Sequence, residues 1–133
     1  ETATTLAQNM YISASAVAQY AALAAFDPET DRILAARRDE FRARRDYLVR
    51  ELEALGFVLP KEIVGAFYVY ADCSAFTEDS EAFCRWLLEE HGVAITPGTD
   101  FGEASARQSV RLSFTTSQSQ LERAVARLRE ALR

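Results

Sequence analysis

The chain has 133 residues, 49% of them hydrophobic and 26% charged, which is the composition of one ordinary globular domain. Its net charge of -5 and pI near 4.9 argue against polyanionic partners, so we expect neither nucleic acid nor an anionic membrane surface as a partner. The two cysteines, Cys73 and Cys84, have no His or Cys at metal-ligand spacing, which argues against a metal site and favours a reducing environment.

No stretch of the sequence approaches the roughly 18 consecutive apolar residues of a membrane span, and no basic-then-apolar leader opens it. The chain begins at Glu1 rather than at a methionine, and its opening reads as the middle of a longer sequence. We therefore expect a cytoplasmic protein of which this chain is a piece.

The first half of the sequence predicts two helices of different character. Residues 15–26 are rich in alanine, with Ser13 or Ser15 placed to cap the helix, and "FDPET" interrupts it. Residues 29–55 predict a long amphipathic helix that Gly56 ends, and its interleaved arginines and acids indicate a solvated face. Its apolar stripe is Ile33, Phe41, Leu48, Leu52 and Leu55, and its expected ion pairs are Glu40 with Arg44 and Asp46 with Arg50.

The second half predicts three short strands and two helices. Apolar residues over 64–70 predict a strand covered on both faces, and residues 93–95 and 109–114 predict two more. One helix begins at Asp79 or Ser80 and is closed by Gly92, and a capping box at Ser117 begins the last helix. The residues expected to face inward are Phe83, Leu87 and Trp86 or Leu88 in the first of these helices, and Leu121, Val125, Leu128 and Leu132 in the second.

These elements predict an α+β fold. We expect a small, mostly antiparallel or mixed three-stranded sheet covered by helices, preceded by a short helix and a long linking helix. The one plausible boundary lies near Asp27 and Pro28, where the alanine-rich helix gives way to the charged one.

Few residues carry the side chains that catalysis requires. The single histidine, His91, lies at the end of a predicted helix, where its charge would favour the helix C-terminus, and this leaves no hydrolase triad. The single lysine, Lys61, follows Pro60 in a predicted surface turn, whereas Schiff-base chemistry needs a desolvated lysine. We therefore predict no catalytic residue and no metal ligand in this chain.

Arg111 is the residue whose setting suggests a binding role. It lies between Val110 and Leu112 in a predicted strand, on the face opposite these apolar residues, and the loop Pro97–Gly102, anchored by Phe101, is expected to lie beside it. A planar, permanently charged guanidinium can donate two parallel hydrogen bonds to a carboxylate. On these residues alone, an exposed arginine on the open face of an antiparallel sheet remains the alternative.

Three segments of the sequence carry a family resemblance in combination. They are "GAFYVYADCS", "DSEAFCRWLLEEHGVAITPGTDFG" and "SVRLSFTTSQSQLERAVARL", which closely resemble the C-terminal small domain of class I/II pyridoxal-phosphate aminotransferases, the aspartate aminotransferase-like group of fold type I. The opening "NMYISASAVAQYAALAAF" resembles the segment that follows the cofactor lysine in this family. The resemblance covers essentially the whole chain. It implies that residues 1–27 lead out of a large domain and that residues 28–133 form the small domain.

The resemblance also implies roles for individual residues. Arg111 matches the family's arginine that binds the α-carboxylate of the substrate. Phe67 matches an aromatic position that lines the same cleft, with a place in the core as the alternative. The Pro97–Gly102 loop is expected to shape the cleft wall more than to contact the substrate. Ser13 and Ser15 lie where family members approach the cofactor of the neighbouring subunit.

The resemblance implies a parent enzyme of amino acid metabolism that uses pyridoxal phosphate to move an amino group from an amino acid to a 2-oxo acid. We expect that parent to be a homodimer in which this domain closes over the substrate. The large domain and its cofactor lysine have no counterpart in the sequence, so we expect the chain alone to be inactive and to bind no pyridoxal phosphate. The alternatives are a lyase, decarboxylase or synthase with the same cofactor, and a non-catalytic module that binds an amino acid or a protein.

Overall fold

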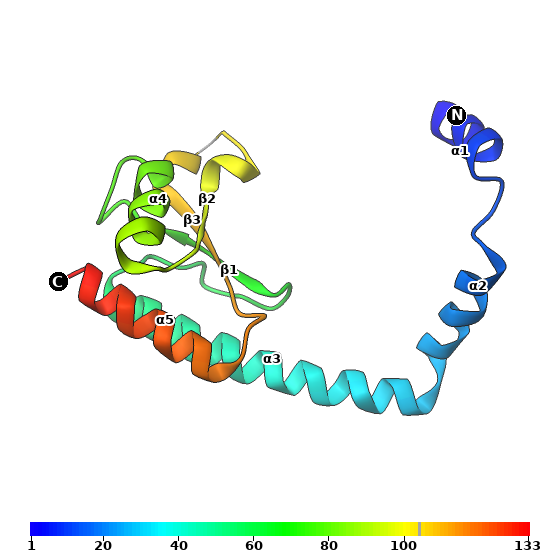
Figure 1. The fold of residues 1–133 in the computed structure, drawn as a ribbon, viewed down its shortest axis with the longest axis horizontal. Coiled ribbons are helices and arrows are strands. Elements are labelled where there is room, and N and C mark those ends of the chain that lie inside the picture. Colours follow the sequence, from blue (N-terminus) through cyan, green and yellow to red (C-terminus); the bar gives the residue numbers. More distant parts are fainter. Residues whose placement is uncertain (104) are drawn as a thin grey trace. The chain divides into compact units, whose positions relative to one another are not determined.

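The computed structural model describes residues 1–103 and 105–133. These residues contain five α-helices and a three-stranded sheet (Figure 1). In chain order the elements are α1 (Thr2–Met10), α2 (Ala16–Leu23), the 3₁₀ helix η1 (Ala24–Phe26), α3 (Pro28–Leu55), β1 (Tyr68–Asp72), α4 (Ser80–His91), β2 (Thr96–Pro97), the 3₁₀ helices η2 (Gly98–Phe101) and η3 (Ala106–Gln108), β3 (Ser109–Ser113) and α5 (Gln118–Ala131). The chain divides into two units, Glu1–Asp39 and Glu40–Arg133, and the second has the predicted α+β fold.

The sheet has the order β1-β3-β2, and both of its pairings are antiparallel. Val69 and Ala71 of β1 and Val110 and Leu112 of β3 lie on one face and are buried. The residues between them, such as Arg111, lie on the other face because strand side chains alternate, and Arg111 is only partly buried. The predicted sheet is therefore antiparallel throughout, with one covered face.

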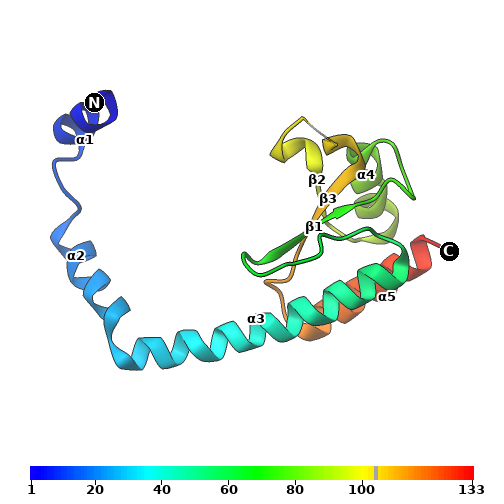
Figure 2. The same ribbon diagram turned by 180° about the vertical axis from the view of Figure 1, so that it is seen from behind.

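Three helices cover that buried face. One hydrophobic cluster joins the sheet to α3, α4 and α5. The helix residues in this cluster are Leu48, Leu52, Phe83, Cys84, Leu87, Leu121, Val125 and Leu128. Figures 1 and 2 show α5 running beside the C-terminal half of α3, where Arg129 donates a hydrogen bond of 2.7 Å to Glu51. These contacts confirm most of the predicted inward-facing residues.

Two expected inward-facing residues of α4 are not buried. Trp86 is 37% exposed and Leu88 is 54% exposed. The buried residues of α4 include Ser80, Phe83 and Leu87, whose spacing of three and four marks a single stripe. Trp86 and Leu88 fall beside that stripe, so the prediction that one of them faces inward was wrong.

The helix ends predicted at Gly56, at Asp79 or Ser80, at Gly92 and at Ser117 are confirmed, whereas the helix predicted over 15–26 ends at Leu23 and continues as the 3₁₀ helix η1. The Asp79 carboxylate accepts hydrogen bonds from the first turn of α4, and Gly92 closes the helix in the left-handed conformation with φ +62°. The Ser117 hydroxyl accepts from the Gln120 N–H at 3.4 Å and begins α5. Gly56, with φ +104°, follows the end of α3.

The strand predicted over 64–70 begins later than expected. Val64 is 85% exposed and Ala66 has φ +60°, a left-handed conformation that breaks an extended strand before Phe67. β1 therefore starts at Tyr68. Its alternate residues are only partly buried, so the expectation that both faces are covered was also wrong.

The strand predicted over 93–95 is displaced towards the C-terminus. The Val93 N–H donates to the Leu87 carbonyl at 2.9 Å, so the chain just after Gly92 completes the end of α4 instead of pairing in the sheet. Val93 is buried in the core, and β2 starts only at Thr96. The apolar pattern at this position reflects the burial of Val93 in the core and not the pairing of a strand.

One of the two ion pairs predicted along α3 is confirmed. Arg44 pairs with Glu40, whereas Asp46 pairs with its neighbour Arg45 at 2.7 Å instead of with Arg50. Arg50 instead pairs with Glu51 at 3.8 Å. Ile33, predicted to lie on the apolar stripe, is 47% exposed.

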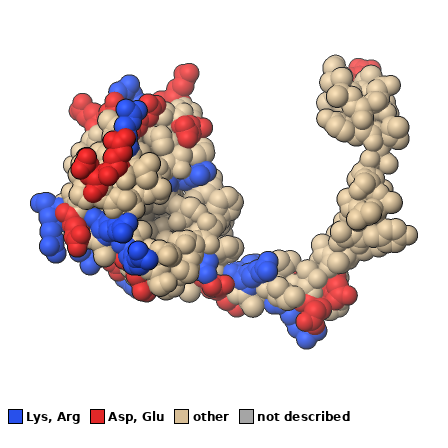
Figure 3. Space-filling model, in the orientation of Figure 1, with Lys and Arg blue, Asp and Glu red and all other residues tan. Residues whose placement is uncertain are grey.

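Residues 1–26 differ from the rest of the chain in composition and in burial. α1 was not predicted, α2 begins one residue after the expected cap Ser15, and neither helix contains a buried residue. Glu1 is the single charged residue of this segment, and Figure 3 shows its surface almost without charged side chains. No helix in the part of the chain that the structure describes is both long and apolar enough to cross a membrane.

Candidate carboxylate-binding site

The sheet register places Arg111 at the centre of the uncovered face. β3 is the middle strand, and Arg111 lies opposite Tyr70 of β1 on one side and Thr96 of β2 on the other. Its neighbours Val110 and Leu112 point into the core and fix the strand, so the arginine is held on a rigid element. The predicted alternation in "VRLSF" is thus confirmed.

Two aromatic rings flank the guanidinium of Arg111. Its central carbon lies 4.7 Å from the centre of the Phe101 ring and 5.4 Å from that of Tyr68. Phe101 in turn meets the Tyr70 ring edge-on, with centroids 6.2 Å apart. The rings restrict the orientation of the guanidinium and exclude water from it on the sides that they cover.

The charge of Arg111 has no carboxylate partner among the described residues. Its Nη2 donates a long hydrogen bond of 3.4 Å to the Thr96 hydroxyl, and its Nε is buried without any hydrogen-bond partner. Desolvating a charge without pairing it is costly, so the arrangement favours an anion that can accept from the terminal nitrogens. A carboxylate has the planar geometry that fits such a donor.

The loop Pro97–Gly102 lies beside Arg111, as the sequence predicts, since its Phe101 ring contacts the guanidinium. Pro97 is the last residue of β2, and the residues that follow it form η2. Gly98 is needed there because a Cβ on it would lie 2.4 Å from the Ala106 carbonyl oxygen and 2.7 Å from the Tyr70 hydroxyl. This close packing brings Phe101 back over the guanidinium. The cleft-wall role expected for the loop remains a prediction.

Phe67 contacts Tyr68, one of the two rings that flank Arg111. Its ring meets the Tyr68 ring edge-on with centroids 5.6 Å apart, and Tyr68 flanks Arg111. Phe67 is 48% exposed, so the structure does not place it in the core. Its carbonyl accepts a hydrogen bond of 3.0 Å from the Phe114 N–H, which fixes the entry to β1.

Ser13 and Ser15 belong to the other unit of the chain. The Ser15 hydroxyl accepts from the Ala18 N–H at 3.2 Å and caps α2, which settles which of the two serines is the cap. Ser13 is exposed, and its N–H donates to the Tyr11 carbonyl at 2.7 Å. Their approach to a cofactor remains a prediction.

Pyridoxal phosphate, which the resemblance implies, does not fit the residues of this chain by themselves. Lys61, the single lysine, is exposed at a bend, whereas a lysine that forms a Schiff base needs a desolvated pocket. The described residues also contain no group of three His, Cys, Asp or Glu that could hold a metal ion.

The remaining candidates for chemistry are structural. His91 ends α4 as predicted, where its ring lies 4.6 Å from that of Trp86. Burial raises the pKa of the Cys73 thiol to about 11 and that of Cys84 to about 12, so both stay protonated and unreactive at neutral pH. Both thiols are free.

Tyr68 and Thr96 are the site neighbours that the sequence did not identify. They touch Arg111 from different strands, and their proximity depends on strand register, which local patterns do not give. The only available signal was the alternation of Tyr68 and Tyr70 with Val69, which places both tyrosines on one face.

Nearly the whole chain is similar to known aminotransferases. Residues 1–128 match the family model described as aminotransferase class I and II. The sequence is 39% identical over 123 residues to a valine–pyruvate aminotransferase of Mycobacterium tuberculosis, covering 92% of this chain and 32% of that protein. It is 35% identical over 127 residues to a (5-formylfuran-3-yl)methyl phosphate transaminase of Methanocaldococcus jannaschii, covering 96% and 33%.

The fold of the chain is also similar to solved structures of aminotransferase relatives. A crystal structure of an aminotransferase from Mycobacterium tuberculosis matches with a TM-score of 0.89 at 39% identity, covering 96% of this chain and 33% of that one. A Methanococcus jannaschii protein, whose active site is described as similar to kynurenine aminotransferases, matches with a TM-score of 0.89 at 34% identity, covering 97% and 34%. The chain spans about a third of the length of the relatives it matches.

Proposed function

The chain belongs to the class I and II aminotransferase family, and on that premise we propose that it is the C-terminal small domain of an aminotransferase, in which Arg111 binds the carboxylate of the amino acid substrate. The observation that carries this proposal is the guanidinium flanked by Tyr68 and Phe101, without an acidic partner among the described residues. Two parallel hydrogen bonds from such a group orient a carboxylate as well as hold it.

The rest of the enzyme is proposed to lie in a large domain outside this chain. In an aminotransferase, pyridoxal phosphate carries the amino group between an amino acid and a 2-oxo acid. Because the residues described here do not fit that cofactor, we propose that the chain alone is inactive. Its part in the reaction is to bind the substrate carboxylate, to orient the substrate and to exclude water as the small domain closes over it.

The proposal extends to the setting of the parent enzyme. We propose a homodimer, in which the segment containing Ser13 and Ser15 approaches the cofactor of the neighbouring subunit, and Phe67 lines the substrate cleft. The free thiols of Cys73 and Cys84 support a cytoplasmic location. The name of the valine–pyruvate aminotransferase of Mycobacterium tuberculosis, which pairs an amino acid with a 2-oxo acid, supports these two substrate classes.

The first test is Arg111→Ala in the full-length parent enzyme. Hydrogen bonds to charged groups contribute roughly 1.5–3 kcal/mol each, so losing two should lower kcat/KM for carboxylate substrates about 10²- to 10⁴-fold. The measurement is kcat/KM over a panel of L-amino acids and of the amines that lack their carboxylate. Cofactor content should remain unchanged.

The matched control is Arg123→Ala, which removes an exposed arginine from α5 and should leave all these rates unchanged. Equal losses for amino acids and for amines in Arg111→Ala would contradict the assigned role, because the carboxylate would then not be the group that Arg111 recognises.

A further inference from the structure

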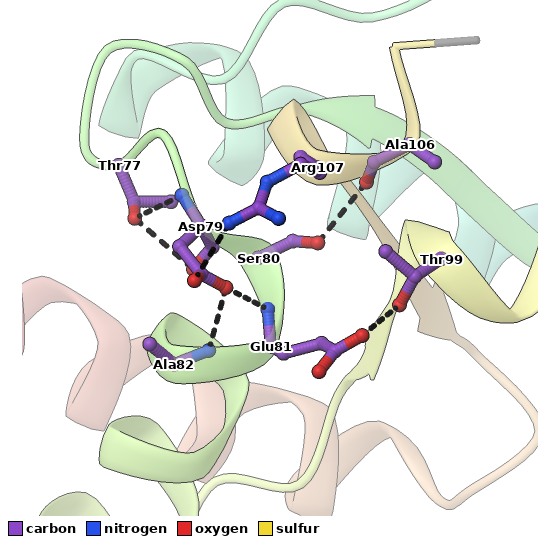
Figure 4. Close-up of polar contacts among 8 residues, drawn as sticks. All are labelled: Thr77, Asp79, Ser80, Glu81, Ala82, Thr99, Ala106 and Arg107. Atoms are coloured by element: carbon purple, nitrogen blue, oxygen red, sulfur yellow. Dashed lines mark hydrogen bonds and ion pairs between the residues drawn. The ribbon is translucent and has the colours of Figure 1, made fainter. Parts of the chain in front are cut away.

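The first turn of α4 is hydrogen-bonded to the segment formed by η2 and η3, and Phe101 of η2 lies over Arg111. Figure 4 shows three contacts that connect them. The hydroxyl of Ser80 donates to the Ala106 carbonyl at 3.0 Å, and Glu81 accepts from the Thr99 hydroxyl at 2.8 Å. The third contact is the ion pair between Arg107 and Asp79, at 3.0 Å. Residues on both sides of Phe101 are therefore held by one helix end.

The buried member of this set carries most of the positional information. Ser80 is fully buried and Ala106 is 2% exposed, so their hydrogen bond is shielded from water. The Thr99–Glu81 and Arg107–Asp79 contacts are exposed and individually weak. Removing the Ser80 hydroxyl takes away the hydrogen bond that joins the Ala106 carbonyl oxygen to α4 and leaves that oxygen only its local donor, the Ser109 N–H, so the segment is free to shift away from α4.

Because η2 packs tightly against its neighbours, a shift of this segment also moves Phe101. Gly98 lies directly against the Ala106 and Ser109 carbonyl oxygens and the Tyr70 hydroxyl. Phe101 follows three residues later, at the end of η2, and its ring lies over the guanidinium of Arg111. A displaced segment therefore moves the ring away from the guanidinium.

We propose that Phe101 is a positioning residue for Arg111, and that the first turn of α4 holds it in place through Ser80. The ring fixes the plane of the guanidinium before the substrate arrives, so less side-chain freedom is lost when a carboxylate binds. This inference rests on the proposed function, in which Arg111 is the carboxylate receptor.

The experiment uses the full-length enzyme and acetate as a simple carboxylate probe. The quantity measured is the inhibition constant of acetate in competition with the enzyme's fastest L-amino acid substrate, and acetamide serves as the uncharged control. Phe101→Leu should raise the acetate constant about two- to tenfold, since ordering one long side chain on binding costs that much. Phe101→Tyr keeps the ring and should remain within about twofold of the parent.

A ring outside the site provides the matched control. Trp86→Leu removes a partly exposed aromatic from α4 and should leave the acetate constant unchanged. If Phe101→Leu matches the parent enzyme, or if it slows amines without a carboxylate as much as amino acids, the positioning role of Phe101 is overturned.

The hydrogen bond from Ser80 to Ala106, which we call the tether, is tested separately. Ser80→Ala should raise the acetate constant in the same direction as Phe101→Leu, and combining both should add little because both act through one ring. Should Ser80→Ala fail to fold, Thr99→Val, which removes only an exposed donor, should give a smaller rise. Full additivity of the tether variant with Phe101→Leu, or no rise at all, would contradict the link.

The roles of Arg111 and of Phe101 can be disproved separately. If Arg111→Ala leaves the acetate constant unchanged, the proposed function itself is wrong. If Arg111→Ala raises it strongly while Phe101→Leu does not, Arg111 binds the carboxylate without help from the ring, and only the present inference is lost.

Discussion

Residues 1–26 and residues 40–133 show how differently one chain can form helices. The first segment has α1 and α2 without a single buried residue, and its large apolar side chains are exposed. They are Leu6, Met10, Tyr11, Ile12, Val17, Tyr20, Leu23 and Phe26, each more than half exposed. The second segment closes a hydrophobic cluster around its sheet.

The contrast separates helix propensity from tertiary stability. Alanine-rich sequence and a serine cap suffice to form α2, but a short helix without burial is marginal in water. An apolar surface of this kind is expected to be covered in the parent enzyme. The second segment carries Arg111 on a strand whose other face is the core, which is the rigidity that a binding residue needs.

The largest predicted effect compares one leucine from each segment. Leu52 of α3 is fully buried and Leu23 of α2 is 66% exposed. Leu52→Ala should lower the free energy of unfolding of the chain by about 2–5 kcal/mol, because it leaves a cavity in the core. Leu23→Ala should change it by less than about 0.5 kcal/mol.

Urea denaturation followed by the fluorescence of Trp86 measures both variants. The contrast between the two segments breaks down if Leu23→Ala costs as much as Leu52→Ala, since residues 1–26 would then take part in the cooperative core.

A smaller effect compares two serine caps of similar chemistry. Ser117 caps α5, which packs in the core, and Ser15 caps α2, which does not. Ser117→Ala should lower the free energy of unfolding by about 0.5–2 kcal/mol, whereas Ser15→Ala should reduce only the local helix content. Circular dichroism and denaturation on the same samples separate the two results, and a cooperative loss in Ser15→Ala would argue against independent segments.

The smallest effect concerns the acid response of the α4 cap. The N–H of Ala82, with help from the charge of Arg107, holds the pKa of the Asp79 carboxyl below its usual value. A carboxyl with a lowered pKa in the folded state stabilises the protein above its unfolded pKa, and this contribution is lost as the pH falls through the folded value. The loss should therefore occur below about pH 4.

Asp79→Asn keeps an oxygen that can cap the helix but cannot titrate. Its melting temperature should consequently fall less than that of the wild-type chain between about pH 5 and pH 2. Identical acid profiles for the two proteins would show that Asp79 makes no such contribution.

Local chemistry made much of this fold predictable. Asp79, Gly92 and Ser117 mark helix ends through hydrogen bonds to nearby residues; the sequence alone identifies Gly92 and Ser117 and narrows the third to Asp79 or Ser80. The strand limits depend on partners far away in the chain, so apolar runs at 64–70 and 93–95 gave the right neighbourhood with the wrong boundaries. α1 was missed because its threonines are poor helix formers and no burial pattern compensates.

In the candidate site, the placement of Arg111 on the uncovered face of the sheet was predictable, whereas its neighbours were not. Alternation and family resemblance identify Arg111, and the turn residues around Phe101 indicate a loop beside it. Tyr68 and Thr96 touch the guanidinium only because the three strands align in one register. The buried link from Ser80 to Ala106 crosses 26 residues and has no local signal in the sequence.

The central claim is that Arg111 receives the substrate carboxylate. A crystal structure of the full-length enzyme with a carboxylate-bearing substrate analogue tests it most directly. We predict both carboxylate oxygens about 2.7–2.9 Å from nitrogens of the Arg111 guanidinium, with Phe101 still against its face. A carboxylate bound elsewhere, with Arg111 paired to an acidic residue of the protein, would contradict the account.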